Sequence, residues 1–227
     1  MILAVAGGKG GVGKSTVALN LGAELDAVVV DGDLSMADLP AGRGPDLHDV
    51  LAGRADPVEA VREGAAGGSV SLLPCGRSLA GARAADPLRL AATVETVERE
   101  YGAVVVDCPA GLRVDAGVPL AASDACVLVT RPTAPALTDA VRTRALARTL
   151  DAGVAAVVLS RARPSEEERT AVDRLLGGPT VAVPADETVD AARRGGVPVR
   201  EVDPDAAAAV ALGEVAATVR RSLCSAV

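Results

Sequence analysis

The amino-acid sequence predicts a doubly wound α/β fold, with a mostly parallel sheet between two layers of helices. Unbroken apolar runs such as residues 28–30 and 104–106, each Val-Val-Val, indicate strands that are buried on both faces. Stretches with helical periodicity separate these runs, as expected for alternating strands and helices. No linker, composition break or repeat interrupts the 227 residues. We therefore expect one three-layer α/β/α domain over residues 1–227.

The predicted elements follow the chain in order. Strands are expected at residues 2–6, 27–31, 103–107, 125–130, 154–160 and 180–183. Helices are expected at residues 14–25, 86–99, 135–150, 165–176 and 204–223. Glycine and proline punctuate residues 34–70, where we expect short helical pieces at 47–51 and 58–62 and a strand near 69–73. His48 is expected to be a partly exposed residue of the first piece rather than a catalytic base.

A glycine-rich stretch, residues 7–16, joins the first strand to the first helix. From Gly8 to Ser15 it fits the pattern G-x-x-x-x-G-K-[ST], which is typical of loops that bind phosphate through backbone N–H groups at a helix N-terminus. Lys14 is expected to reach the β- and γ-phosphates, and the Ser15 hydroxyl to bind Mg²⁺. The predicted nucleotide contacts in this stretch are Gly8, Gly10, Gly11, Val12, Gly13, Lys14, Ser15 and Thr16.

Lysine occurs at only two positions, Lys9 and Lys14, although the chain has 23 basic residues. Both lysines lie in the glycine-rich stretch, and every other basic residue is an arginine. A lysine ammonium is a compact charge, whereas an arginine guanidinium is a planar fork. The positions that retained lysine are therefore candidates for contacts with phosphate.

Carboxylates follow two of the buried strands. Asp31 and Asp33 lie at and just beyond the end of one strand, and Asp107 ends another, before a Pro/Gly loop. Ligands of doubly wound sheets bind at the carboxyl ends of the strands, where the phosphate loop is also expected. These carboxylates could bind Mg²⁺ and orient an attacking water. The backbone N–H of Gly111 could distinguish ATP from ADP by contacting the γ-phosphate.

The motifs together resemble the MinD/ParA family of deviant Walker ATPases, and MinD in particular. The resemblance rests on K-G-G-V-G-K-S-T at 9–16, D-x-D at 31–33 and D-C-P-A-G at 107–111. It extends through L-H-D-V-L-A-G at 47–53, L-P-C-G-R-S-L at 73–79, residues 138–147 and V-P-A-D-E at 183–187, which is similar to the adenine-side loop of the family. It implies the P-loop ATPase fold, ATP or ADP and Mg²⁺ as ligands, and an ATP-dependent homodimer.

The resemblance also implies residue roles. Lys9 corresponds to the signature lysine, which crosses the dimer interface to the partner's phosphate, and Lys14 to the lysine that acts in its own site. Thr16 would contact the α-phosphate, and Asp33 would orient or activate water. Asp31 and Asp107 would support the Mg²⁺ shell formed with Ser15. The catalytic candidates are thus Lys9, Lys14, Asp33 and Asp107, and the metal candidates are Ser15, Asp31, Asp33 and Asp107.

Three departures from the MinD pattern accompany the resemblance. Asp38 replaces a common Asn, and Ser160-Arg161 replaces an Asn-Arg that holds adenine, so backbone atoms near Pro184 and Asp186 are expected to contact the base together with Arg161. The C-terminal stretch lacks the basic, aromatic membrane helix of MinD. Its apolar residues share one helical face, which favours packing on the core over direct membrane binding. The last four residues only superficially resemble a prenylation box.

Composition narrows the choice of partners. A net charge of −7 disfavours a general DNA-binding surface, although Arg193-Arg194 and Arg220-Arg221 leave a ParA-like DNA-partitioning role open. The four cysteines form no C-x-x-C, which argues against a zinc site or an iron-sulfur carrier. There is no signal peptide pattern, so we expect a cytoplasmic protein that a partner could recruit to a membrane or pole.

These observations predict a MinD-like Mg-ATP switch. It would dimerise on binding ATP, hydrolyse ATP slowly to ADP and phosphate, and position an unidentified protein partner or the cell-division machinery. The alternatives are a ParA-like partitioning ATPase and a nucleotide-bound adaptor with little turnover.

Overall fold

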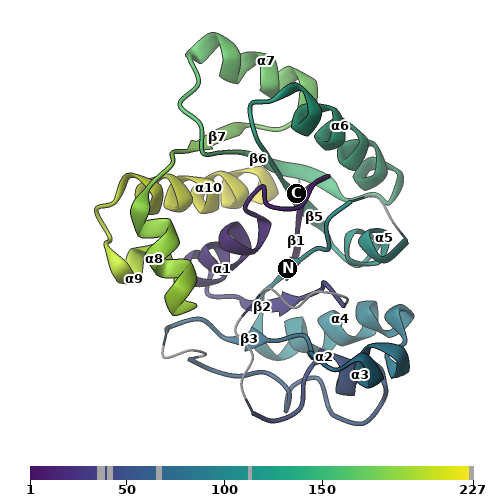
Figure 1. Cartoon of the computed structure of the whole chain (residues 1–227). Helices are drawn as coiled ribbons and strands as arrows, with labels where there is room; N and C mark the ends of the chain where they lie inside the picture. The colour runs from purple at the N-terminus through teal and green to yellow at the C-terminus, as the bar shows by residue number, and fades with distance from the viewer. Residues whose placement is uncertain (35–38, 40–42, 65–67, 112–113, 225–227) are drawn as a thin grey trace.

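The computed structural model describes residues 1–34, 39, 43–64, 68–111 and 114–224. Within them, one sheet of seven parallel strands has the order β3-β2-β4-β1-β5-β6-β7 (Figure 1). The strands are β1 (Ile2–Ala6), β2 (Val28–Asp31), β3 (Leu72–Leu73), β4 (Val104–Asp107), β5 (Ala125–Thr130), β6 (Gly153–Ser160) and β7 (Thr180–Val183). The order reverses direction at β1, so the crevice for ligands is expected beyond the end of this central strand.

Helices cover both faces of the sheet (Figure 1). One face carries α1 (Lys14–Leu25), α8 (Glu187–Gly195), α9 (Val199–Val202) and α10 (Ala207–Cys224). The other side carries α2 (Leu47–Leu51), α3 (Leu79–Ala84), the 3₁₀ turn η2 (Pro87–Arg89), α4 (Leu90–Tyr101), α5 (Val114–Ala121), α6 (Ala134–Thr149) and α7 (Glu166–Leu176). Alternate residues of β1 enter the two layers of core, because successive side chains of a strand point to opposite faces. The predicted three-layer, doubly wound fold is confirmed.

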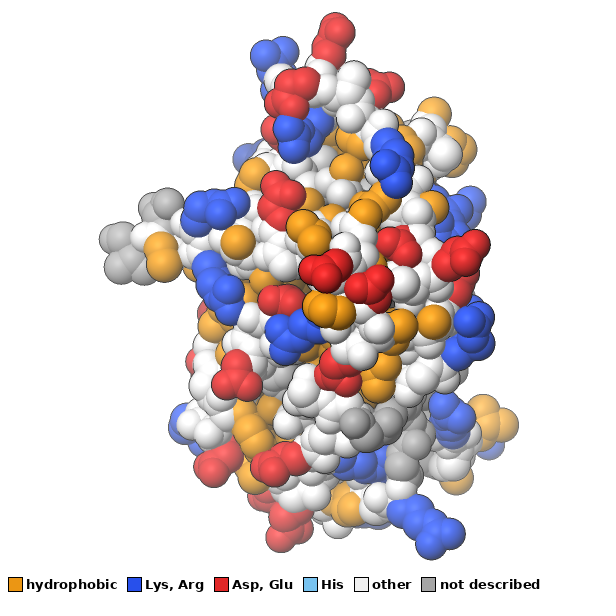
Figure 2. Space-filling view, turned by 90° about the vertical axis from the view of Figure 1, so that its left-hand side faces the viewer, with side chains coloured by type: hydrophobic (Ala, Val, Ile, Leu, Met, Phe, Trp, Pro, Cys, Tyr) orange, Lys and Arg blue, Asp and Glu red, His pale blue; other side chains and the backbone are white. Residues whose placement is uncertain are grey.

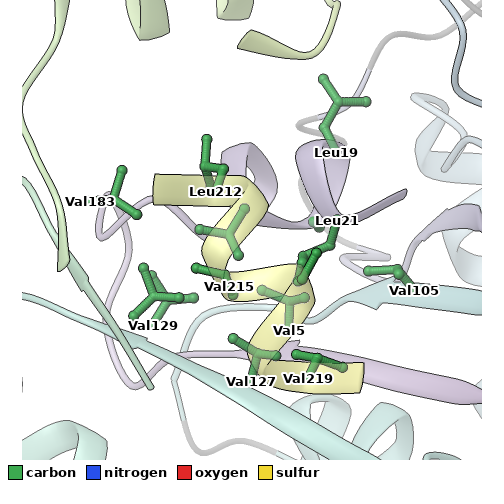
Figure 3. Packing of buried hydrophobic residues seen from close by; sticks show 14 of the residues in the cluster. Val5, Leu19, Leu21, Val105, Val127, Val129, Val183, Leu212, Val215 and Val219 are labelled. Carbon is green, nitrogen blue, oxygen red and sulfur yellow. The ribbon is translucent and has the colours of Figure 1, made fainter. Parts of the chain in front are cut away.

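The largest core cluster is built from Val, Leu and Ala between α1, α10 and the sheet. Figure 3 shows α10 lying over the strands, with Leu212, Val215 and Val219 directed into the same cluster as Val5 and Val127. Small residues let these layers approach closely. A Cβ atom on Gly22 of α1 would lie 2.2 Å from Val29 Cγ2 of β2, so this contact requires glycine.

The C-terminal helix therefore packs on the core as the sequence predicted. Val215 and Val219 are fully buried, and Leu223 is partly buried against the same cluster. In the part of the chain that the structure describes, no helix combines the length and apolar character needed to span a bilayer. The prenylation-like end, residues 224–227, lies largely outside the described residues.

Most predicted strands and helices are present within one or two residues, but three details were wrong. Residues 58–62 form turns rather than a helix, and Arg62 exchanges two backbone hydrogen bonds with Leu72 in an antiparallel bridge. The helix predicted at 86–99 is divided, because Pro87 begins the separate 3₁₀ turn η2 before α4. His48 is 2% exposed rather than partly exposed, because the α2 side chains pack beneath the sheet edge.

Candidate functional site

The glycine-rich stretch lies between the end of β1 and the start of α1, and it packs against β5 and α6. A Cβ atom on Gly7 would lie 2.7 Å from the carbonyl oxygen of Val129 on β5. One on Gly8 would lie 2.5 Å from Cβ of Asp139 on α6. These distances are shorter than a real Cβ contact, so both positions require glycine. The loop is thereby held at the carboxyl edge of the sheet.

The N-terminus of α1 has features that favour an anion. Gly13 precedes the helix with φ of 107°, no side chain caps the helix, and its first turn has no acidic residue. Side chains cap α2, α3, α7 and α8, whereas α4, α6 and α9 also begin without such a cap; α1 differs from these in the glycine loop that precedes it. An uncapped helix start behind a glycine loop has the geometry and partial positive charge of a phosphate-binding site.

The two lysines differ in exposure. Lys14 is 8% exposed at the first position of α1, whereas Lys9 is exposed at the outer part of the loop. Ser15 and Thr16 are half-buried beside Lys14, and Val12 is buried beneath the loop. Gly10 and Gly11 are exposed, and Gly11 has φ of 74°. One lysine therefore faces the interior of the site and the other faces solvent.

The strand-end carboxylates converge as predicted. Asp31 on β2 and Asp107 on β4 are register partners, and they are 0% and 2% exposed. The Gly32 backbone N–H donates to the Asp107 carbonyl at 2.9 Å, which ties the two strand ends together. The Asp31 carboxylate accepts from the backbone N–H groups of Asp33 and Leu39, each at 3.3 Å. It thus positions the start of the segment that carries the half-buried Asp33.

The loop after β4 is short and glycine-containing. Cys108 and Pro109 are buried, and Gly111 is half-buried with φ of 98°, in the region that favours glycine. Gly111 follows the end of β4 by four residues, and its proposed contact with the γ-phosphate stays a prediction. Asp38, the first departure from the MinD pattern, lies outside the described residues.

A pocket of about 290 Å³ lies between the α1 start and the ends of β6 and β7. Its lining includes Ser160, Arg161, Pro184 and Asp186, which the sequence analysis assigned to the adenine side, and Thr16, which it assigned to the α-phosphate. Apolar Val158, Val183 and Leu212 also line it and provide a surface suited to a planar base.

The Asp186 side chain forms hydrogen bonds within the protein. Its carboxylate accepts from the Thr188 hydroxyl at 2.6 Å, the Thr188 N–H at 3.0 Å and the Ala208 N–H at 3.3 Å. The Thr188 hydrogen bonds are the main reason why its pKa is lowered. Only the backbone of Asp186 remains for a base, in keeping with the sequence expectation.

A second pocket, of about 670 Å³, adjoins the first along the loop. Gly10, Gly11, Gly13, Lys14, Ser15 and Thr16 form one side of it. Arg131, Arg193 and Val197 line other parts, and Gly13, Thr16 and Arg161 are shared by both pockets. The two pockets form one continuous space from the ends of β6 and β7 to the phosphate loop.

Sequence reasoning missed two residues here. Asn20 links the site to α9, since its amide donates to the Thr16 carbonyl at 2.8 Å and accepts from the Val199 N–H at 2.9 Å. Arg131 directly follows β5 and reaches the second pocket. The position of Arg131 after a buried strand was a signal that could have identified it, whereas the Asn20 bridge depends on distant packing.

A buried cluster lies close to the segment after Asp33. The His48 Nε2 atom lies 3.0 Å from the Leu34 carbonyl oxygen and 3.3 Å from Cys75 Sγ. Burial, with further contributions from Asp31 and Asp46, raises the pKa of Cys75 to about 12. The thiol therefore stays protonated at neutral pH, and the cluster supports the segment rather than serving as a nucleophile.

This uncapped helix behind a glycine loop, with paired strand-end carboxylates, defines a P-loop nucleotide-binding protein. A family model described as "CobQ/CobB/MinD/ParA nucleotide binding domain" matches residues 3–199. The chain therefore belongs to that family.

Curated relatives agree with this assignment. Two ATP-binding proteins of unknown function from Methanocaldococcus jannaschii are 32% and 35% identical to it. The first alignment covers 95% of this chain and 86% of the relative, and the second covers 85% and 77%. The septum site-determining protein MinD of Synechocystis is 29% identical over 72% of this chain and 65% of its own.

Solved structures have the same architecture. The cell division ATPase MinD of Pyrococcus furiosus superposes with a TM-score of 0.88 at 28% identity, covering 97% of this chain and 98% of the other. MinD of Pyrococcus horikoshii, determined in complex with Mg-ADP, has a TM-score of 0.86 at 28% identity, covering 95% and 93%. These similarities establish the fold and the resemblance to archaeal MinD.

Proposed function

We propose that this protein is a Mg-ATP-dependent switch of the MinD type, formed from one domain over residues 1–227. It would bind ATP, dimerise, and hydrolyse ATP to ADP and phosphate to control the position of a protein partner. It would act in the cytoplasm and reach a surface through that partner. The observation that carries the proposal is the contrast between buried Lys14 and exposed Lys9 in one phosphate loop.

The nucleotide is proposed to be ATP or ADP. The uncapped α1 start and Lys14 suit the phosphates, and the smaller pocket beside Pro184 and Arg161 suits the base. Mg-ADP is bound by the Pyrococcus horikoshii MinD, whose fold this chain shares. ATP-binding proteins are also among the relatives that align with most of this chain.

The site has oxygen donors that fit Mg²⁺, a cation that prefers oxygen ligands and retains several waters. We assign the Ser15 hydroxyl as the direct protein ligand, with Asp31 and Asp107 orienting bound waters. Mg²⁺ would neutralise phosphate charge. In the described residues no group of three or more His, Cys, Asp or Glu forms a separate protein metal cage, so the nucleotide would supply further ligands.

Hydrolysis requires a water in line with the γ-phosphate. We assign Asp33 to orient this water or accept its proton, because Asp33 is less buried than Asp31 and follows it at the strand end. Lys14 would stabilise negative charge on the phosphates in its own site. Exposed Lys9 would supply a second positive charge to nucleotide bound in another copy of the chain, much as an arginine finger does.

Two measurements test this function. Single-turnover ATP hydrolysis should be much slower in Asp33→Ala than in the wild type, because the water loses its orienting carboxylate. Size-exclusion chromatography of Asp33→Ala with Mg-ATP should give a dimer that the additional change Lys9→Ala abolishes. Equal hydrolysis rates would favour an adaptor with little turnover, and an unchanged monomer would contradict the dimeric switch.

The contacts of Arg193, Arg220 and Arg221 give less support to a ParA-like DNA-partitioning role than to the MinD-type switch. Arg193 lies beside Asp190 at 3.8 Å, the Arg220 guanidinium donates to the Glu24 carbonyl, and Arg221 donates to Thr218 at 2.9 Å. Figure 2 shows acidic and basic side chains interspersed on the face that carries α8 to α10. A salt-dependent shift on duplex DNA would favour the ParA-like role instead.

A further inference from the structure

Arg131 lies at the carboxyl edge of the sheet beside the phosphate loop. It directly follows β5, the strand next to β1. The loop approaches the end of this strand so closely that a Cβ atom on Gly7 would meet the Val129 carbonyl at 2.7 Å. Arg131 lines the same 670 Å³ pocket as Gly10, Gly11 and Lys14. Arg131 and the phosphate loop therefore line one pocket.

The Arg131 guanidinium lacks a protein partner among the residues that the structure describes. Its Nε atom is buried and makes no hydrogen bond, and no ion pair includes the side chain. Burying part of a cation without a counter-charge is unfavourable, so such a side chain is suited to an anion that arrives from solvent. In the described part of the chain, Arg131 thus differs from an arginine such as Arg200, which pairs with Glu24 at 3.2 Å.

The charge of the pocket favours an anion of high charge density. Lys14, Arg131, Arg161 and Arg193 line it, and none of the other lining residues that the structure describes is acidic. Arg161 and Arg193 are exposed, whereas Arg131 is partly buried. Partial burial strengthens an arginine–phosphate contact, because water screens it less.

We propose that Arg131 binds the β- or γ-phosphate of the nucleotide, as a second cation that lines the same pocket as Lys14. This inference rests on the proposed nucleotide-binding function and adds a residue that none of the recognised motifs includes. Because a guanidinium can hold two phosphate oxygens at once, Arg131 would distinguish ATP and ADP from AMP.

The test compares Arg131→Gln with Arg148→Gln, an exposed position in the last turn of α6 that lines neither pocket. ATP, ADP and AMP are titrated in competition with a fluorescent ATP analogue. We expect R131Q to lose about tenfold or more in affinity for ATP and ADP but little for AMP, as for a lost charged hydrogen bond. Arg131→Lys should lose less, and R148Q should match the wild type.

The melting temperature distinguishes a role of Arg131 in phosphate binding from a role in stabilising the fold. Without nucleotide, R131Q should melt at the wild-type temperature or above it, because an unpartnered cation is removed. With Mg-ATP, its stabilisation should be smaller than that of the wild type. A destabilised nucleotide-free protein, unchanged ATP affinity or an equal loss for AMP would each overturn the proposal.

Failure of the underlying function would look different. If the wild-type protein and R148Q bound no nucleotide, the proposed nucleotide switch itself would be wrong. If both bound ATP normally and R131Q bound it equally well, only the role of Arg131 would be wrong.

Discussion

Asp31 and Asp107 are directly opposed on neighbouring parallel strands, and both are almost completely buried. Each ends its strand, β2 or β4, and the Gly32 N–H bonds to the Asp107 carbonyl between them. The sheet therefore brings together two carboxylates that are far apart in sequence. A nearby cation would reduce the repulsion between them, which leads to a prediction on metal dependence.

Asp107→Asn keeps the shape of the side chain but removes one charge. We expect Mg²⁺ to strengthen ATP binding about tenfold less in this variant than in the wild type, because bound waters lose a charged acceptor. ATP affinity without Mg²⁺ should stay the same or rise. Calorimetric titration with and without Mg²⁺ checks both values. Asp151→Asn, an exposed site with φ of 59°, is the matched control, and an identical Mg²⁺ response in D107N would contradict the assignment.

Gly8→Ala tests how tightly the loop is packed on α6. The new Cβ would lie 2.5 Å from Asp139 Cβ and 2.6 Å from its carbonyl oxygen, so loop or helix must shift. We expect a loss of about 1–3 kcal/mol in the free energy of unfolding, measured with urea and no nucleotide. Gly10→Ala meets nothing within 4 Å and should change it by less than about 0.5 kcal/mol. Equal effects at both positions would argue against this packing.

His48→Leu tests the buried cluster behind Asp33. The change removes the Nε2 contact and leaves the Leu34 carbonyl, 3.0 Å away, without that partner. We expect a loss of about 1–3 kcal/mol in unfolding free energy, because a buried polar group loses its hydrogen bond. Arg54→Gln, which removes a surface ion pair with Asp49 at 3.0 Å, should cost less than about 1 kcal/mol. Urea unfolding of both variants decides whether the buried contact matters more.

Three buried thiols predict a loss of stability at alkaline pH. Burial raises the pKa of Cys75 and Cys126 to about 12 and that of Cys108 well above its ordinary value. In the unfolded chain the pKa of these thiols is about 8.5. Above that pH the folded protein holds more protons than the unfolded chain, so unfolding free energy should fall as pH rises toward 12.

Thiol labelling gives an independent check of this burial. At pH 8, a maleimide should modify native protein at exposed Cys224 and react with Cys75, Cys108 and Cys126 only after unfolding. Mass spectrometry of the digested protein identifies the modified positions. Rapid labelling of Cys75 in the native protein would show that the cluster beside Asp33 opens.

Much of the fold could be predicted because its strands carry a strong local signal. The Val-Val-Val-Asp runs form β2 and β4. Continuous apolar runs of this kind are typical of strands that are buried on both faces of a parallel sheet. Residues 58–62 were mistaken for a helix because a short apolar-polar stretch lacks a distinctive period, and pairing of Arg62 with Leu72 decided its structure. The exposure of His48 was misjudged for the same reason, since α2 is too short to define its buried face.

The sequence by itself identified the residues of the candidate nucleotide site. No knowledge of packing was needed to find the glycine pattern, the two lysines and the strand-end aspartates. The glycine loop requires only local backbone freedom, and the aspartates are located by the ends of parallel strands. Only the tertiary structure decided which groups have partners. It buried Lys14 and left Lys9 exposed, paired Asp31 with Asp107, and placed Arg131 at the loop with no ion-pair partner among the described residues. Those relationships depend on contacts between distant segments, which local residue patterns do not encode.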